Sequence, residues 1–136
     1  MKRVIVFCLM ILLFISCRSY SEKDLIGVYT PVNYRNTFDT IHLKKNNKYY
    51  RTVYNKSKER VIEIRGEWSV REDVIEFKSP YFLNLDRDLV MYPELLQDTE
   101  SNGLGYIWKK VGVFEFCVGY FGVDLPNQNC YRRLND

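Results

Sequence analysis

Cysteine side chains carry the most direct chemical signal in this sequence of 136 residues. Cys8 and Cys17 lie near the N-terminus, whereas Cys117 and Cys130 lie near the C-terminus. In an oxidising compartment, the C-terminal pair is expected to form a disulfide, which would stabilise the fold by roughly 3 kcal/mol. Two free buried thiols are an alternative. A zinc site is a third interpretation, but zinc takes three or four Cys or His ligands in such sites, and the sequence has one histidine, His42.

The first residues indicate the compartment. Lys2 and Arg3 precede an unbroken apolar run over residues 4–15, which ends at Ser16 and Cys17. A basic head, a short apolar stretch and a small residue before the cut are typical of a secretory signal peptide. The run is too short for a comfortable transmembrane helix, which needs roughly 20 apolar residues. The sequence therefore predicts export from the cytoplasm.

The junction Phe14-Ile15-Ser16-Cys17 resembles the lipobox of bacterial lipoproteins, in which the cysteine receives a diacylglycerol and becomes the first residue of the mature chain. The resemblance implies a signal peptide over residues 1–16, lipidation of Cys17 with palmitate-type acyl chains, and a lipid-anchored protein of the bacterial cell envelope. Arg18, in place of Asp, favours the outer membrane in a host with two membranes. The alternatives are an uncleaved membrane anchor and a plain signal peptide with Cys17 free.

Composition restricts what the exported part does. Without Lys2 and Arg3 the 20 basic residues fall to 18, against 17 acidic residues, so no basic excess for nucleic acid exists. All 11 tyrosines follow the signal peptide, and aromatic residues suit the half-buried surface of a sheet. We expect a polar tether over residues 17–23 and one all-β domain over residues 24–136.

Alternating side chains predict the strands that position any site. Asn46 and Asn47 indicate a tight turn, since asparagine tolerates left-handed backbone geometry. Successive antiparallel strands form a meander, the pattern of a small up-and-down barrel. Cys117 and Cys130 would then lie on neighbouring strands. One helical turn is expected over residues 94–98. The predicted strands cover residues 25–32, 38–44, 49–55, 60–70, 74–78, 106–110, 112–120 and 130–134.

Short motifs along these strands resemble small lipocalin-like (calycin-type) bacterial lipoproteins. The pattern consists of Gly27-x-Tyr29, Asp39-Thr40-Ile41-x-Leu43, Tyr49-Tyr50-Arg51, Gly66-Glu67-Trp68 and Ile75-x-Phe77. The likeness covers residues 17–78 and is weaker afterwards, where Tyr131-Arg132 is similar. It implies a lipid-anchored, lipocalin-like barrel and names no catalytic residue.

Polar side chains that could perform catalysis are few. His42 alternates with Ile41 and Leu43, so we expect it to face solvent without an orienting partner. Glu63 and Glu67 could act as a carboxylate pair, but Arg65 between them would neutralise both. Acidic loops at residues 86–88 and at Asp124 lack the spacing of a calcium loop. The sequence therefore predicts no enzyme, no metal and no cofactor.

Aromatic side chains are the remaining candidates for contact with a ligand or partner, and the simpler interpretation places about half of them in the core. We expect a non-enzymatic binding module that contacts the membrane through its lipid and binds a protein partner or a small lipophilic ligand. An immunity or inhibitor lipoprotein that blocks a toxin or lytic enzyme is the alternative. A hydrolase of envelope polymers is the alternative of another class. The candidate contact residues are Tyr49, Tyr50, Tyr54, Trp68, Tyr81 and Tyr92.

Overall fold

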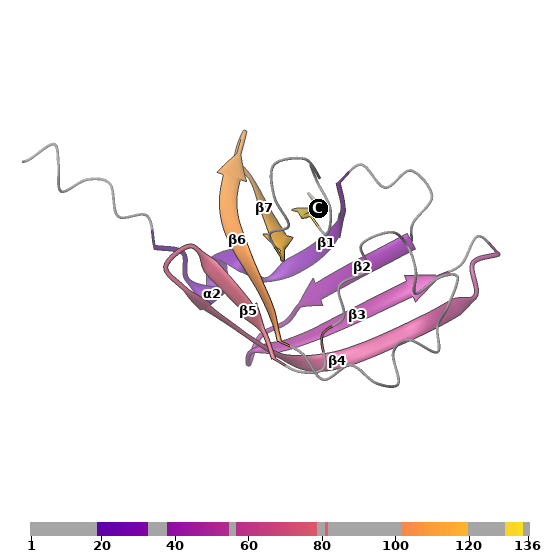
Figure 1. Ribbon diagram of the computed structural model, residues 1–136. Coiled ribbons are helices and arrows are strands. Elements are labelled where there is room, and N and C mark those ends of the chain that lie inside the picture. The colour runs from indigo at the N-terminus through magenta and orange to yellow at the C-terminus, as the bar shows by residue number, and fades with distance from the viewer. Residues whose placement is uncertain are drawn as a thin grey trace, which may run out of the picture.

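Eight antiparallel strands close into a barrel in the computed structural model, which describes residues 19–32, 38–54, 57–78, 81, 102–119 and 130–134 (Figure 1). Each strand pairs with its neighbours in the sequence, and the first pairs with the last. The predicted fold, an all-β antiparallel up-and-down barrel, is therefore confirmed. The elements are α2 (Glu22–Leu25), β1 (Gly27–Pro31), β2 (Phe38–Leu43), β3 (Lys48–Tyr54), β4 (Arg60–Arg71), β5 (Val74–Phe77), β6 (Gly103–Lys110), β7 (Val113–Val118) and β8 (Cys130–Arg133).

Alternation along the strands decides which side chains fill the barrel. On β4, Ile62, Ile64 and Trp68 are buried, whereas Arg65 and Glu67 between them are exposed. Successive strand residues point to opposite faces, so this period of two separates the interior from the outer wall. The alternation by which the sequence predicted this strand is therefore confirmed.

The β2–β3 hairpin closes through a turn at Asn46 and Asn47. Their φ angles of 63° and 59° lie in the left-handed region, which asparagine tolerates better than most residues. The main-chain amide of Lys44 donates to the carbonyl oxygen of Lys48 across the turn, at 2.9 Å. The predicted turn is therefore confirmed.

The chain enters the barrel differently from the prediction. Leu25, expected at the start of a strand, instead ends helix α2, and β1 begins at Gly27. The carboxylate of Asp24 accepts hydrogen bonds from the amide and the hydroxyl of Ser21, which satisfies the amide at the N-cap of this helix. Tyr20, expected in the tether, packs against the core with its ring 5.3 Å from that of Phe114. Among the described residues no helix combines the length and apolarity that a membrane span requires.

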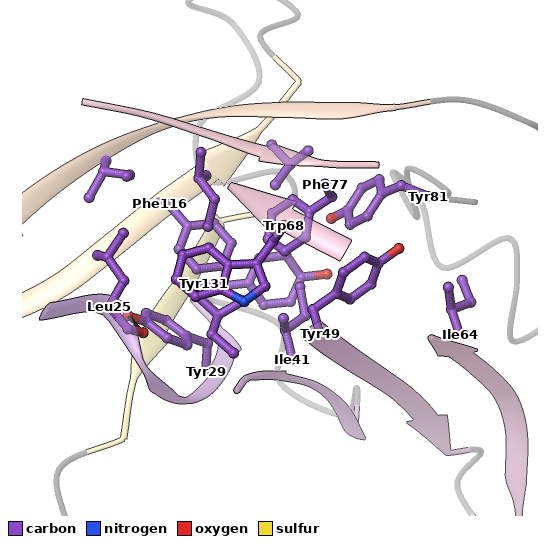
Figure 2. Close-up of a cluster of buried hydrophobic side chains, with 14 of the residues drawn as sticks. Leu25, Tyr29, Ile41, Tyr49, Ile64, Trp68, Phe77, Tyr81, Phe116 and Tyr131 are labelled. Carbon is purple, nitrogen blue, oxygen red and sulfur yellow. Dashed lines mark hydrogen bonds between the residues drawn. The ribbon is translucent and has the colours of Figure 1, made fainter. Parts of the chain in front are cut away.

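Aromatic rings occupy much of the barrel interior (Figure 2). The Phe77 ring lies 4.9 Å from the Tyr81 ring and 5.6 Å from the Phe116 ring, and Phe116 in turn stacks on Tyr131 at 5.5 Å. Ring pairs at such distances contribute stability beyond the area that they bury. These side chains connect β5, β7 and β8 through the centre of the barrel.

Gly66 creates room for one of these rings. It lies opposite Tyr49 in the β3–β4 register, and a Cβ atom at residue 66 would come within 2.5 Å of the Tyr49 ring. An alanine there would push the ring out of its place, which overpacks the core. The glycine before Trp68 in the Gly-x-Trp pattern therefore serves packing.

A disulfide joins Cys117 on β7 to Cys130 on β8, where the two residues are register partners. The pair is thus not available as a zinc site or as free thiols, and the sequence prediction of a disulfide is confirmed. It closes a loop over residues 118–129, so it restricts the unfolded chain more than the folded one.

We predict that Cys117→Ala together with Cys130→Ala lowers the free energy of unfolding by about 3 kcal/mol, because the open chain regains loop entropy. Urea denaturation followed by tryptophan fluorescence measures the change, with the reduced wild-type protein as the control. An unchanged midpoint in both samples would contradict a stabilising bond.

Candidate functional site

A charged cluster lies inside the barrel. Arg51 on β3 is fully buried and Asp39 on β2 is 3% exposed. The Arg51 guanidinium donates through Nε to Asp39 Oδ1 at 3.1 Å and through Nη2 to Asp39 Oδ2 at 2.7 Å. The hydroxyl of Tyr131 on β8 donates to Asp39 Oδ2 at 2.6 Å and accepts from Arg51 Nη2 at 2.9 Å. Three strands are joined through this one cluster.

The surroundings keep Arg51 charged and Tyr131 protonated, because both pKa values are raised. Burial by itself would lower the pKa of Arg51, but the adjacent Asp39 raises that pKa well above its usual value. Burial raises the pKa of Tyr131 well above its usual range, so its hydroxyl stays protonated and donates to the carboxylate. The guanidinium carbon also lies 5.1 Å from the centre of the Tyr81 ring, within cation–π range.

This geometry suits structure better than catalysis. Both oxygens of Asp39 already accept hydrogen bonds, and the Arg51 charge is held between the carboxylate and two aromatic rings. A general acid or base needs access to a substrate proton. The residues of the cluster instead hydrogen-bond to one another, so we assign them to fixing the barrel.

The aromatic candidates from the sequence do not form one surface. Tyr49, Trp68 and Tyr81 are each no more than 2% exposed and belong to the core (Figure 2). Tyr50 and Tyr54 are half-buried. Tyr92 lies outside the described residues, as do Cys17, the expected helical turn at 94–98, the 86–88 loop and Asp124.

His42 and Tyr50 are register partners on the outer wall of β2 and β3, with their rings 6.2 Å apart. Tyr50 also contacts two cations, since Lys44 Nζ lies 5.5 Å and the Arg65 guanidinium 5.2 Å from the centre of its ring. His42 is half-buried on this wall, which places it outside the barrel as its alternation with Ile41 predicts.

The charged stripe on β4 also lies on the outer wall. Arg65 donates to Glu63 Oε1 through Nε at 2.9 Å and Nη2 at 2.6 Å, and this hydrogen bonding lowers the pKa of Glu63. Lys48 donates to Glu67 at 2.6 Å and lowers the pKa of that carboxyl in the same way. Neither carboxyl can hold a proton near neutral pH as a general acid would.

The outer face of β6 exposes three large apolar side chains in succession. Leu104 is 58%, Tyr106 59% and Trp108 36% exposed. Trp108 is fixed in place, because its Nε1 donates to Glu115 Oε2 at 3.0 Å, and the nearly buried Glu115 accepts at Oε1 from Arg132 at 2.5 Å. We name Leu104, Tyr106, Trp108, Glu115 and Arg132 the β6–β8 face.

The β6–β8 face was not among the sequence candidates, although a signal existed. Leu104, Tyr106 and Trp108 alternate with Gly103, Gly105 and Ile107. Gly103 and Gly105 occupy inward positions of this alternating segment. Leu104, Tyr106 and Trp108 lie at the positions between and after them, which point outward. The strand was expected to begin at residue 106, which hid this pattern.

No protein-family model matches the chain, and no curated protein or solved structure matches it either. Within the described residues, no group of three or more His, Cys, Asp or Glu side chains is arranged to hold a metal ion.

We predict that Asp39→Asn lowers the free energy of unfolding by about 3–5 kcal/mol, because it leaves the Arg51 charge buried without its partner. Tyr131→Phe should cost about 1–3 kcal/mol, the penalty for one lost buried hydrogen bond. Urea denaturation measures both.

The matched control is Glu63→Gln, which breaks an ion pair on the outer wall, where such pairs contribute little. Equal destabilisation by Asp39→Asn and Glu63→Gln would contradict a special role for the buried cluster.

Proposed function

We propose that this protein is a non-enzymatic binding module, anchored to the bacterial cell envelope through lipid on Cys17, that contacts a protein partner through the β6–β8 face. The observation that carries the proposal is the exposure of Leu104, Tyr106 and Trp108 along one strand. Exposed apolar groups that cluster on a small domain mark contact sites more often than chance exposure does.

The chemistry of the β6–β8 face favours a protein. Tyr, Trp and Arg are the residue types that most often dominate the energy of protein interfaces. The indole of Trp108 is already oriented by Glu115, so little freedom is lost when a partner packs against it. A lipophilic ligand would instead need room in the interior, where Phe77, Phe116 and Tyr131 pack on one another.

The anchor and the barrel support a small lipocalin-like lipoprotein as the type of molecule. The eight-stranded closed barrel is compatible with a calycin-like fold, and the first 17 residues carry the signal-peptide and lipobox pattern. An immunity or inhibitor lipoprotein is a narrower form of the same proposal, since a rigid barrel with one preformed contact face suits a blocking role. We propose no hydrolase, because neither His42 nor the Glu63–Glu67 stripe has the arrangement of an acid or base.

We predict that Trp108→Ala weakens capture of the partner about 30-fold or more, as loss of a central interface aromatic does. The measurement is quantitative pull-down from envelope extract by the tagged chain, with the captured partner titrated. Tyr50→Ala is the matched control, because it removes a half-buried aromatic from the outer wall of β3, which is three strands away from β6 in the barrel. Undiminished capture by Trp108→Ala, or loss of capture with Tyr50→Ala alone, would refute the proposal that the partner binds through the β6–β8 face. Turnover of a cell-wall substrate that disappears with His42→Ala would favour the enzyme instead.

The anchor has its own test. Cys17→Ser removes the thiol that would receive the lipid, so the variant should leave the detergent phase in phase partitioning, whereas Cys8→Ser should not change it. Equal partitioning of the wild type and Cys17→Ser would contradict lipidation.

A further inference from the structure

One end of the barrel is defined by where the chain enters it. Helix α2, the β2–β3 turn, the β4–β5 turn, the β6–β7 turn and the end of β8 all lie at this end, because the strands run up and down in sequence. The main-chain amide of Tyr20 donates to the carbonyl oxygen of Glu72 in the β4–β5 turn at 3.1 Å. We name this end of the barrel the tether end.

A basic hollow of about 730 Å³ opens at the tether end, with the buried Trp68 in its wall. Its lining includes four basic side chains and one acidic side chain, Glu22. Glu22 is engaged by Asn47, whose side-chain amide donates to it at 2.5 Å. The basic residues are Lys23, Lys44, Lys45 and Arg133, of which the three lysines are exposed.

The other charged residues at the tether end do not cancel the excess of basic side chains in the hollow. Asp24 is hydrogen-bonded to Ser21, and its main-chain carbonyl accepts from Arg133 Nη1 at 2.9 Å. The β4–β5 turn adds Glu72 and Asp73 next to Arg71, and β6 ends with Lys109 and Lys110. Basic groups therefore outnumber acidic groups at the tether end, although the exported chain as a whole is nearly neutral.

The length of the tether brings this end close to the membrane. Two residues, Arg18 and Ser19, lie between Cys17 and Tyr20, and the three residue steps of extended chain span at most about 11 Å. Electrostatic interactions with a charged surface extend over a Debye length of about 8 Å at physiological ionic strength. A basic surface held at that distance is attracted to anionic headgroups.

We propose that the tether end is a docking surface for the anionic phosphate headgroups of the lipid leaflet, so that the barrel stands on the membrane with this end down. The orientation rests on the proposed lipid anchor, whereas the affinity of the basic hollow for anionic lipid does not. Each lysine or arginine near such a surface strengthens binding about fivefold.

The test uses the full-length chain with Cys17→Ser in every sample, so that no lipid anchor contributes. Binding is measured by co-sedimentation with vesicles of phosphatidylcholine alone and with vesicles that also contain phosphatidylglycerol. The ratio of the two affinities isolates the electrostatic part, and the N-terminal segment contributes equally in all variants. Near-ultraviolet circular dichroism checks that each variant folds.

Lys23→Gln with Lys45→Gln should reduce the anionic preference about tenfold or more, since two of the exposed lysines of the hollow are lost. The matched control is Lys58→Gln with Arg60→Gln, which removes two exposed cations from the opposite end of the barrel. This control should keep the preference. Equal losses in both pairs, a larger loss in the control, or no loss in either would overturn the proposal. Failure of lipidation would show only in the phase partitioning of Cys17→Ser, so the two failures are distinguishable.

Discussion

The ion pair between Arg51 and Asp39 is the constraint on which the barrel depends. Removing both charges from water costs several kcal/mol per ion, and only hydrogen bonds of good geometry offset that cost. Asp39 obtains them from Arg51 and Tyr131, which arrive from different strands. A slip of one residue in the β2–β3 register would turn Arg51 to the outer wall and leave Asp39 unpaired. The cluster therefore favours the observed β2–β3 register, in addition to any contribution that it makes to the free energy of unfolding.

The packed rings of the interior restrict where the described residues contact other molecules. Arg51, Tyr131 and the rings around Phe77 occupy the space that a lipophilic ligand would need at this level of the barrel. Among the described residues, the outer wall and the ends of the barrel offer the exposed alternatives. The fixed indole of Trp108 and the basic hollow at the tether end are two of these alternatives, one offering apolar contact area and the other charge.

The sequence predicted most of the strands but not the start of β1, the start of β6 or the exposed side chains along β6, and the reason is physical. Alternation determined the faces of β4, and Asn46-Asn47 determined the β2–β3 turn. Alternation also places Arg51 on the same face as Tyr49 and Val53, but a charge argues against burial unless its partner is known. Asp39 and Tyr131 are distant in sequence, so the pairing emerges only in three dimensions. Aromatic residues suit a core and a surface equally, which is why Tyr49 and Trp68 were assigned to a possible contact site.

One orientation of the molecule leaves the β6–β8 face accessible while the tether end rests on a membrane. Strand β6 runs from the far end of the barrel at Gly103 to the tether end at Lys110, so Leu104, Tyr106 and Trp108 lie along the side wall. If the basic tether end rests on anionic headgroups, this wall stands roughly upright from the membrane. Trp108 is then nearer to the lipid and Leu104 farther from it, and neither is covered by the leaflet. With the proposed lipid anchor on Cys17, a partner protein would reach the β6–β8 face from the side while the anchor stays in place, which is the arrangement that the proposed binding module requires.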